Sequence, residues 1–155
     1  MYFEHDFAVR LEWLGNRGEG TRDVRSYGRE HVVTAGAAPA IQGSAAKPFR
    51  GDESRWNPEQ LLIASLSQCH LLSYLFVAAR AGVVVTAYED DAIGTLRQEG
   101  DAGRFESVTL RPVVTISSGN PDLALALHEE AARNCFIANS VAFPVHHEPR
   151  TVVAV

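Results

Sequence analysis

The chain contains two cysteines, Cys69 and Cys135, and their thiols are the side chains best suited to covalent chemistry. A thiolate attacks peroxides and disulfides and binds metal ions. Where no export signal is present, two cysteines more often indicate chemistry, a metal site or plain packing than a permanent disulfide. Redox chemistry, metal binding and burial as small apolar side chains are therefore the three interpretations that the residue types leave open.

Histidines could complete a metal site with these thiols. His70 follows Cys69 directly, and His146 and His147 are adjacent near the end of the chain. Structural metal sites usually show spacings such as Cys-x-x-Cys or His-x-x-x-His, and neither is present here. We therefore predict no metal ligand set and no cofactor, and we assign His70 no catalytic role.

The composition is that of a soluble protein with one domain. The chain has 155 residues, 46% of them apolar, which suffices for a core without crosslinks. A net charge of -5 and scattered basic residues argue against nucleic-acid binding. Residues 1–10 carry acidic side chains and do not resemble a secretory signal. We expect a single domain over residues 1–155, located in the cytoplasm.

A long helix is predicted to position Cys69. The run Asn57-Pro58-Glu59-Gln60 combines a capping asparagine, a proline at the first helical position and a glutamine suited to a capping box. The helix should continue to about Ala81 and end at Gly82. Polar groups interrupt its apolar residues between 61 and 85, which favours a buried helix over a membrane span.

A second helix is predicted to carry Cys135. Its start, Asn120-Pro121-Asp122, repeats the pattern of the first helix, and Pro144 lies beyond its end. The residues at helical spacing are Leu123, Leu127, Ala131, Cys135 and Ala138.

Alternating apolar residues predict strands around the two helices. Residues 35–56 form a long loop with a short strand near Ile41. The order of strands, helix, strands, helix and strand indicates an α+β fold with mainly antiparallel sheets. The predicted strands span residues 7–13, 24–34, 83–96, 108–116 and 150–155.

The two cysteine segments resemble the OsmC and organic-hydroperoxide-resistance (Ohr) superfamily. Residues 57–85 (NPEQLLIASLSQCHLLSYLFVAARAGVVV) are similar to its central helix, in which a cysteine follows the glutamate of Asn-Pro-Glu by ten residues. Glu59 and Cys69 hold that spacing. Residues 134–141 (NCFIANSV) are similar to the second cysteine motif, in which the matching residues are Cys135, Asn139 and Ser140.

This resemblance implies a fold and a function. The fold would be OsmC-like, with mainly antiparallel sheets around a long central helix, in an intertwined homodimer. The function would be that of a thiol-dependent peroxidase in an antioxidant stress response, reducing organic hydroperoxides and, less well, hydrogen peroxide. Cys69 would form a sulfenic acid and Cys135 would resolve it as a disulfide. The reductant would be a dithiol such as a lipoylated protein.

The resemblance also implies that Glu59 orients an arginine that activates Cys69. OsmC-type relatives place this arginine shortly before Asn-Pro-Glu, and we therefore predict Arg50. Ohr-type relatives take it from the first hairpin. The alternatives to Arg50 are Arg17, Arg22 and Arg55.

Helix geometry adds a separate argument for the dimer. Glu59 and Cys69 are ten residues apart on one helix, which is about 15 Å along its axis. A straight helix therefore keeps them apart within one chain, whereas two antiparallel copies would bring Glu59 of one beside Cys69 of the other.

Two other functional classes remain open. The family often has proline after its second cysteine, where this chain has Phe136, so the fold could serve to bind a small molecule or a sulfur species with little peroxidase activity. In an unrelated α+β protein, both cysteines would be structural.

Overall fold

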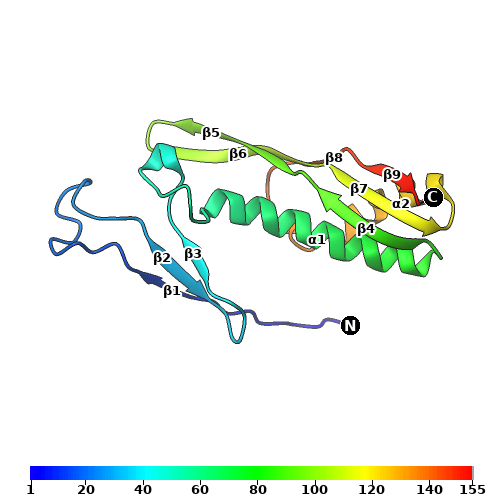
Figure 1. Ribbon diagram of the computed structural model, residues 1–155, viewed down its shortest axis with the longest axis horizontal. Helices are drawn as coiled ribbons and strands as arrows, with labels where there is room; N and C mark the ends of the chain where they lie inside the picture. The colour runs from blue at the N-terminus through cyan, green and yellow to red at the C-terminus, as the bar shows by residue number, and fades with distance from the viewer. Residues whose placement is uncertain (155) are drawn as a thin grey trace. The chain divides into compact units, whose positions relative to one another are not determined.

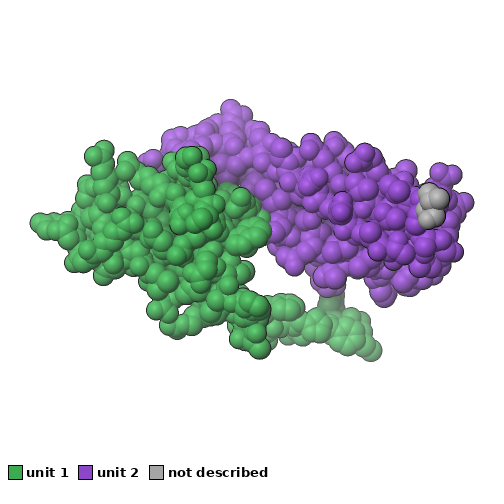
Figure 2. Space-filling view, in the orientation of Figure 1, with its two compact units in different colours: residues 1–61 green, residues 62–155 purple. Residues whose placement is uncertain are grey.

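Two units with separate sheets make up the chain in a computed structural model that describes residues 1–154. The first unit is Met1–Leu61 and the second is Leu62–Val155 (Figure 2). The expected single domain over residues 1–155 stays a prediction, because two units defined by their contacts need not fold independently.

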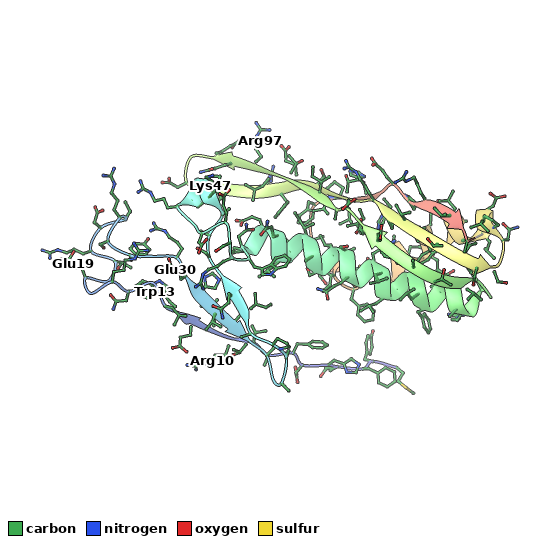
Figure 3. All side chains as sticks on the ribbon, viewed as in Figure 1. Arg10, Trp13, Glu19, Glu30, Lys47 and Arg97 are labelled. Carbon is green, nitrogen blue, oxygen red and sulfur yellow. The ribbon has the colours of Figure 1, made fainter. Side chains whose placement is uncertain are left out.

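The first unit contains one antiparallel sheet in the order β1-β2-β3 (Figure 1). Trp13, labelled in Figure 3, ends the first strand and donates its indole N–H to the carbonyl of Gly28 at 2.9 Å. The elements are β1 (Arg10–Trp13), β2 (His31–Thr34), β3 (Ile41–Gly43) and the 3₁₀ turn η1 (Lys47–Phe49).

The predicted strand over residues 24–34 is wrong in its first half, because β2 begins only at His31. Side chains hold the preceding segment in turns. The Asp23 carboxylate accepts from the N–H of Arg25 at 2.9 Å, and the Ser26 hydroxyl donates to the carbonyl of Gly20 at 2.8 Å. Such local bonds compete with a strand ladder.

The helix predicted at Asn57 is present as α1 (Pro58–Arg80). The Asn57 side chain accepts from the N–H of Gln60 at 2.8 Å, which satisfies one free donor of the first turn. Gly82, with φ 73°, adopts the left-handed conformation that ends many helices. Both helix ends are therefore as predicted.

The second unit holds the rest of α1, a second helix and two three-stranded sheets, in the orders β4-β7-β9 and β5-β6-β8. In residues 1–154, four of the six pairings between named strands are antiparallel, which confirms a mainly antiparallel α+β fold. The strands are β4 (Val84–Asp90), β5 (Ile93–Glu99), β6 (Ala102–Leu110), β7 (Pro112–Ser118), β8 (Val145–His147) and β9 (Arg150–Val153).

Two strands predicted as continuous are each divided between the two sheets. The segment 83–96 becomes β4 and β5, and the segment 108–116 contributes to β6 and β7. The Asp90 carboxylate accepts from the N–H of Arg111 at 2.6 Å, which links the two break points. The alternation of buried side chains continues across Arg111, from Leu110 to Pro112, so periodicity alone does not reveal the break.

The second helix, α2 (Pro121–Asn134), begins as predicted and ends earlier. The Asn120 side chain accepts from two N–H groups of the first turn. Cys135 is the residue after the helix, with extended backbone (φ −75°, ψ 108°), so its predicted place inside the helix is wrong. The Asn139 amide donates to the Arg133 carbonyl at 3.0 Å and satisfies part of the helix end. The 3₁₀ turn η2 (Ala138–Ser140) follows.

The core of the second unit joins α1 to both sheets and to α2. Tyr74 of α1 is fully buried, and its hydroxyl donates to the carbonyl of Ala124 in α2 at 2.8 Å. A smaller cluster joins Leu66 to β6. The main cluster contains Tyr74, Val77, Ala78, Val83, Val114, Ile116, Ala124, Leu127 and Ala131.

Another face of α1 remains apolar and exposed in the single chain. It presents Leu72, Leu75 and Phe76. By length and hydropathy α1 could also cross a membrane, with a mean hydropathy of 1.7, but core helices of soluble proteins pass the same test. A face of this kind is typically covered by another surface.

Candidate functional site

The structure brings the two thiols together in the second unit. Cys69 lies in the middle of α1 and is partly exposed, whereas Cys135 is 1% exposed. Burial, and to a lesser extent the Cys69 thiol beside it, raises the pKa of Cys135 to about 11. Cys135 is therefore a protonated thiol at neutral pH, and Cys69 is the thiol that a solute can reach.

Cys135 is held in place by the turn that follows α2. Its Sγ accepts a hydrogen bond from the N–H of Ala138 at 3.4 Å. The extended backbone of Cys135 takes its thiol off the α2 axis, and the Cys69 thiol of α1 lies beside it. Asn139 and Ser140, which match the family motif, each make a side-chain bond that stabilises this turn.

Cys69 opens onto a cavity of about 530 Å³ in the second unit. Leu72 and Phe76 line it, whereas Leu66 and Tyr74 are buried in the core. Phe136 follows the second cysteine and is 79% exposed at the cavity. The lining residues are Cys69, Leu72, Ser73, Phe76, Arg133, Asn134, Phe136 and Asn139.

Glu59 lies at a second cavity, of about 440 Å³, within the first unit. Its Oε2 atom is buried and has no hydrogen-bond partner among residues 1–154. A buried carboxylate oxygen without a partner is costly and is usually explained by a missing group. The other lining residues are Trp13, Tyr27, Gly28, Arg29, His31, Ser44, Ala45, Phe49 and Pro58.

Arg29 lines this cavity, and it is not among the arginines predicted from the sequence. Its guanidinium donates to the carbonyls of Tyr27 at 2.7 Å and Val24 at 2.9 Å, and lies 4.2 Å from the centre of the Tyr27 ring. These contacts fix a positive charge at the cavity that Glu59 also lines. No local motif marks Arg29, because its place depends on the turns before β2.

The four arginines predicted from the sequence do not line the cavity at Glu59. Arg50 is exposed and sits at the end of η1 with a left-handed backbone (φ 63°). The other three pair with different carboxylates at 3.4 to 3.6 Å. These pairs are Arg17 with Glu30, Arg22 with Glu19, and Arg55 with Asp52.

Three histidines form a stack beside the core of the second unit. The Nε2 atom of His70 lies 3.0 Å from Nδ1 of His128, and the His70 ring centre lies 4.4 Å from that of His147. His128, absent from the sequence-based candidates, also stacks on Tyr74 at 4.0 Å. Among residues 1–154, no group of three or more histidine, cysteine or acidic residues has the geometry of a metal site.

Burial keeps these imidazoles neutral. Loss of solvation, and then repulsion from the charge that His147 carries when protonated, lowers the pKa of His70 to about 3 and that of His128 to about 4. An unfolded histidine titrates near 6.5. As the pH falls from about 6.5 toward 4, the unfolded chain therefore binds protons that the folded chain excludes, and the folded state loses stability.

We therefore predict a marked sensitivity to acid. Each buried histidine should lower the free energy of unfolding by about 1.4 kcal/mol per pH unit below 6.5. Urea unfolding at pH 7 and pH 5 measures the difference. His128→Gln removes one titrating group and should reduce the slope, even though the variant is less stable at pH 7. If the pH dependence of the free energy of unfolding is the same in His128→Gln, His128 is not one of the buried histidines that cause it.

The chain is similar to a known protein family and to a curated relative. A family model described as "OsmC-like protein" matches residues 51–150, which include Glu59 and both cysteines. A curated relative, the uncharacterized protein YmaD of Bacillus subtilis (strain 168), is 21% identical over 142 residues, covering 89% of this chain and 87% of that protein.

Solved structures share the fold over nearly the whole chain. An OsmC-like protein of unknown function from Vibrio cholerae O1 biovar eltor superposes with a TM-score of 0.84 and 30% identity, over 94% of this chain and 99% of that one. An organic hydroperoxide resistance protein from Elizabethkingia anophelis superposes with a TM-score of 0.70 and 17% identity, over 99% and 100% of the chains. At that identity the second likeness concerns the fold alone.

Proposed function

The chain belongs to the OsmC-like protein family, and from that premise we propose that it is a cysteine-based peroxidase reducing organic hydroperoxides. The observation that carries the proposal is the contrast between the thiols. Cys69 is accessible at a mainly apolar cavity, and Cys135 lies beside it, buried and with a pKa raised by burial to about 11. Cys69 can therefore react with a substrate, and Cys135 can then react with the oxidised Cys69.

The proposed cycle has three steps. The Cys69 thiolate attacks the terminal peroxide oxygen, so that an S–O bond forms, the O–O bond breaks and the alkoxide leaves as an alcohol after taking a proton. Cys135 then attacks the sulfenic acid at Cys69, giving a disulfide and water. An external dithiol, such as a lipoylated protein, reduces the disulfide to two thiols and is itself oxidised to a cyclic disulfide. Hydrogen peroxide would be a poorer substrate, because it gains nothing from the apolar lining.

The state of Cys135 suits the order of these steps. While Cys69 is a thiolate, its charge helps to raise the pKa of Cys135 and keeps that thiol protonated. Oxidation of Cys69 to a neutral sulfenic acid removes this contribution, so the resolving thiol ionises more readily once it is needed. Phe136, which follows Cys135 in the chain, has a largely exposed side chain.

The activating arginine is proposed to be Arg29, with Arg50 as the alternative. Arg29 and Glu59 line one cavity, and the Glu59 Oε2 atom has no partner among residues 1–154. Because Glu59 and Cys69 are about 15 Å apart along α1, we propose that Arg29 and Glu59 of one chain serve Cys69 of the partner chain. This arrangement requires a homodimer in which the two α1 helices lie at the centre and run antiparallel to each other.

The exposed apolar face of α1 supports such a dimer. Leu72, Leu75 and Phe76 would be covered by the partner chain, which removes apolar surface from water. A cytoplasmic location fits a cycle that depends on a reduced dithiol. An antioxidant role in a stress response follows from the same activity.

The test uses the fully reduced protein and a stoichiometric amount of tert-butyl hydroperoxide. We expect the loss of both thiols and a mass decrease corresponding to two hydrogen atoms per chain, as an internal disulfide requires. Addition of a reduced dithiol should restore both thiols. If both thiols survive excess peroxide, the peroxidase proposal fails, and binding of a small molecule or sulfur species by the same fold takes its place.

A further inference from the structure

The cavity at Glu59 is also lined by a histidine that has no part in the cycle described above. His31 begins β2 and lines this cavity together with Glu59 and Arg29. The strand register places His31 between Trp13 on β1 and Gly43 on β3, so these three residues share one face of the first sheet. Trp13 lines the same cavity. The sheet therefore holds the imidazole on the side of the cavity.

A hydrogen bond fixes the tautomer of this imidazole. The Nδ1 atom of His31 lies 2.9 Å from the backbone carbonyl oxygen of Arg29. A carbonyl oxygen can only accept a hydrogen bond, so Nδ1 carries the proton. In the neutral ring, Nε2 therefore holds a lone pair and is the atom that can take up a further proton.

Gly43 provides the space for the ring of His31. A Cβ atom on Gly43 would collide with the Nε2 atom of His31 and with the ring carbons beside it. The backbone of Gly43 does not have the left-handed conformation that favours glycine. The glycine is therefore explained by the imidazole that lies against it, and the position of that imidazole depends on the missing side chain.

The proposed reaction needs a group that accepts a proton and later donates one. The thiol of Cys69 must lose its proton before it attacks, and the leaving alkoxide must gain one. Arginine ordinarily stays protonated and glutamate ionised at neutral pH, whereas histidine is the residue type that exchanges protons there. His31 is the one histidine among the residues that line the cavity at Glu59.

We propose that His31 is the general base and general acid of the peroxidase reaction, acting from one chain on Cys69 of the partner chain. This inference rests on the proposed function and on the dimer in which Arg29 and Glu59 serve that cysteine. Nε2 takes the proton from the thiol, and the thiolate attacks the terminal peroxide oxygen, so that an S–O bond forms as the O–O bond breaks. The imidazolium then gives this proton to the leaving alkoxide. The products are a sulfenic acid and an alcohol, and Nε2 again holds a lone pair.

Glu59 favours the imidazolium that forms during this cycle. It lines the same cavity, and its Oε2 atom is buried without a hydrogen-bond partner among residues 1–154. A negative charge near a histidine stabilises the protonated ring. The guanidinium of Arg29 has the opposite effect, but its N–H groups are directed to the carbonyls of Tyr27 and Val24.

Oxidants with different leaving groups test the proton transfer. The oxidant tert-butyl hydroperoxide releases an alkoxide, which needs a proton, whereas peracetic acid releases acetate, which does not. Stopped-flow measurement on the intact reduced protein gives the rate of the first oxidation of Cys69 by each. We expect His31→Gln to slow the reaction with tert-butyl hydroperoxide roughly 10²-fold. The reaction with peracetic acid should slow less, because only the thiol proton is then transferred, so the ratio of the two rates should fall roughly tenfold.

Two further variants make this test specific. His146→Gln removes an exposed histidine that does not line the cavity at Glu59, and both rates should stay unchanged. Gly43→Ala keeps the imidazole but places a Cβ atom against Nε2, so the ratio should fall as it does in His31→Gln. An equal loss with both oxidants in His31→Gln would show a structural role and overturn the assignment, as would an equal fall of the ratio in His146→Gln.

Alkylation by iodoacetamide separates this inference from the peroxidase function. The reagent forms a C–S bond with the Cys69 thiolate as iodide leaves, so it reports the loss of the thiol proton without any peroxide. At neutral pH, His31→Gln should slow this alkylation roughly tenfold, measured by mass analysis of the Cys69 peptide. If alkylation slows while neither oxidant reacts with the unchanged protein, the peroxidase function fails and His31 remains the base for Cys69. If both oxidants react and neither the ratio nor the alkylation depends on His31, the inference alone fails.

Discussion

Cys69→Ser is expected to abolish thiol-dependent reduction of hydroperoxides, with kcat/KM lower by roughly 10³-fold or more. The serine hydroxyl cannot ionise near neutral pH and cannot become a sulfenic acid. Cys135 cannot replace the lost thiol, because it is buried and its pKa is raised by burial to about 11. Peroxide consumption with a dithiol reductant measures the loss, and tert-butyl hydroperoxide avoids any contribution from substrate charge.

Cys135→Ser is the matched variant, since it removes the other thiol by the same change. It should still react once with peroxide at close to the normal rate, because Cys69 and its cavity remain. The sulfenic acid then lacks its partner, so further peroxide should add two or three oxygen atoms to Cys69 in total. Mass analysis of the Cys69 peptide follows these products. Equal loss of the first reaction in both variants would reject the division of roles between the thiols.

Arg29→Gln is expected to slow the first oxidation of Cys69 by roughly 10²-fold, the usual effect of losing a positioned donor at a reacting group. The variant removes the guanidinium and its charge and leaves a shorter, neutral polar side chain. Arg50→Gln is the control, because Arg50 is exposed at the end of η1 and does not line the cavity at Glu59. Stopped-flow measurement of the first thiol oxidation compares the two. A large effect at Arg50 and none at Arg29 would restore the sequence-based assignment.

Mixing variants tests whether the site is shared between chains. In a dimer of one Cys69→Ser chain and one Arg29→Gln chain, one site would contain both intact residues and the other neither. Random exchange of subunits makes half of the dimers mixed, so about a quarter of the normal activity should return. No recovery after verified exchange would place Arg29 and Cys69 of one chain in the same site, or exclude Arg29.

The local elements were predictable because their signals lie within a few residues. The asparagine caps at Asn57 and Asn120 and the glycine at Gly82 act through bonds and backbone angles that do not depend on the rest of the fold. The spacing of Glu59 and Cys69 on one helix is likewise a property of the helix. Together with the resemblance of the cysteine segments, these signals determined the α+β class and the family.

The predictions of the end of the second helix and of the strand boundaries failed because residues far apart in the sequence determine them. Helical spacing continues through Cys135 to Ala138, but α2 ends at Asn134, where the Asn139 amide bonds to the Arg133 carbonyl, and the Cys135 thiol lies beside Cys69. Alternation likewise continues across Arg111, where the chain passes from one sheet to the other. In both cases the periodic pattern indicates only that a residue is buried. It does not indicate which element the residue packs against, and that element is what changes.

The sequence by itself therefore determined where the two helices begin and that the strands are mainly antiparallel. Through the two cysteine segments it also determined the family. Only the tertiary structure decided that Arg29 shares a cavity with Glu59, that His128 stacks on His70, and that Arg133 lines the cavity at Cys69. The physical reason is that a cap or a glycine turn is stabilised by atoms a few bonds away, whereas these side chains acquire their roles from neighbours brought close by folding. No local pattern distinguishes them from other arginines and histidines of the chain.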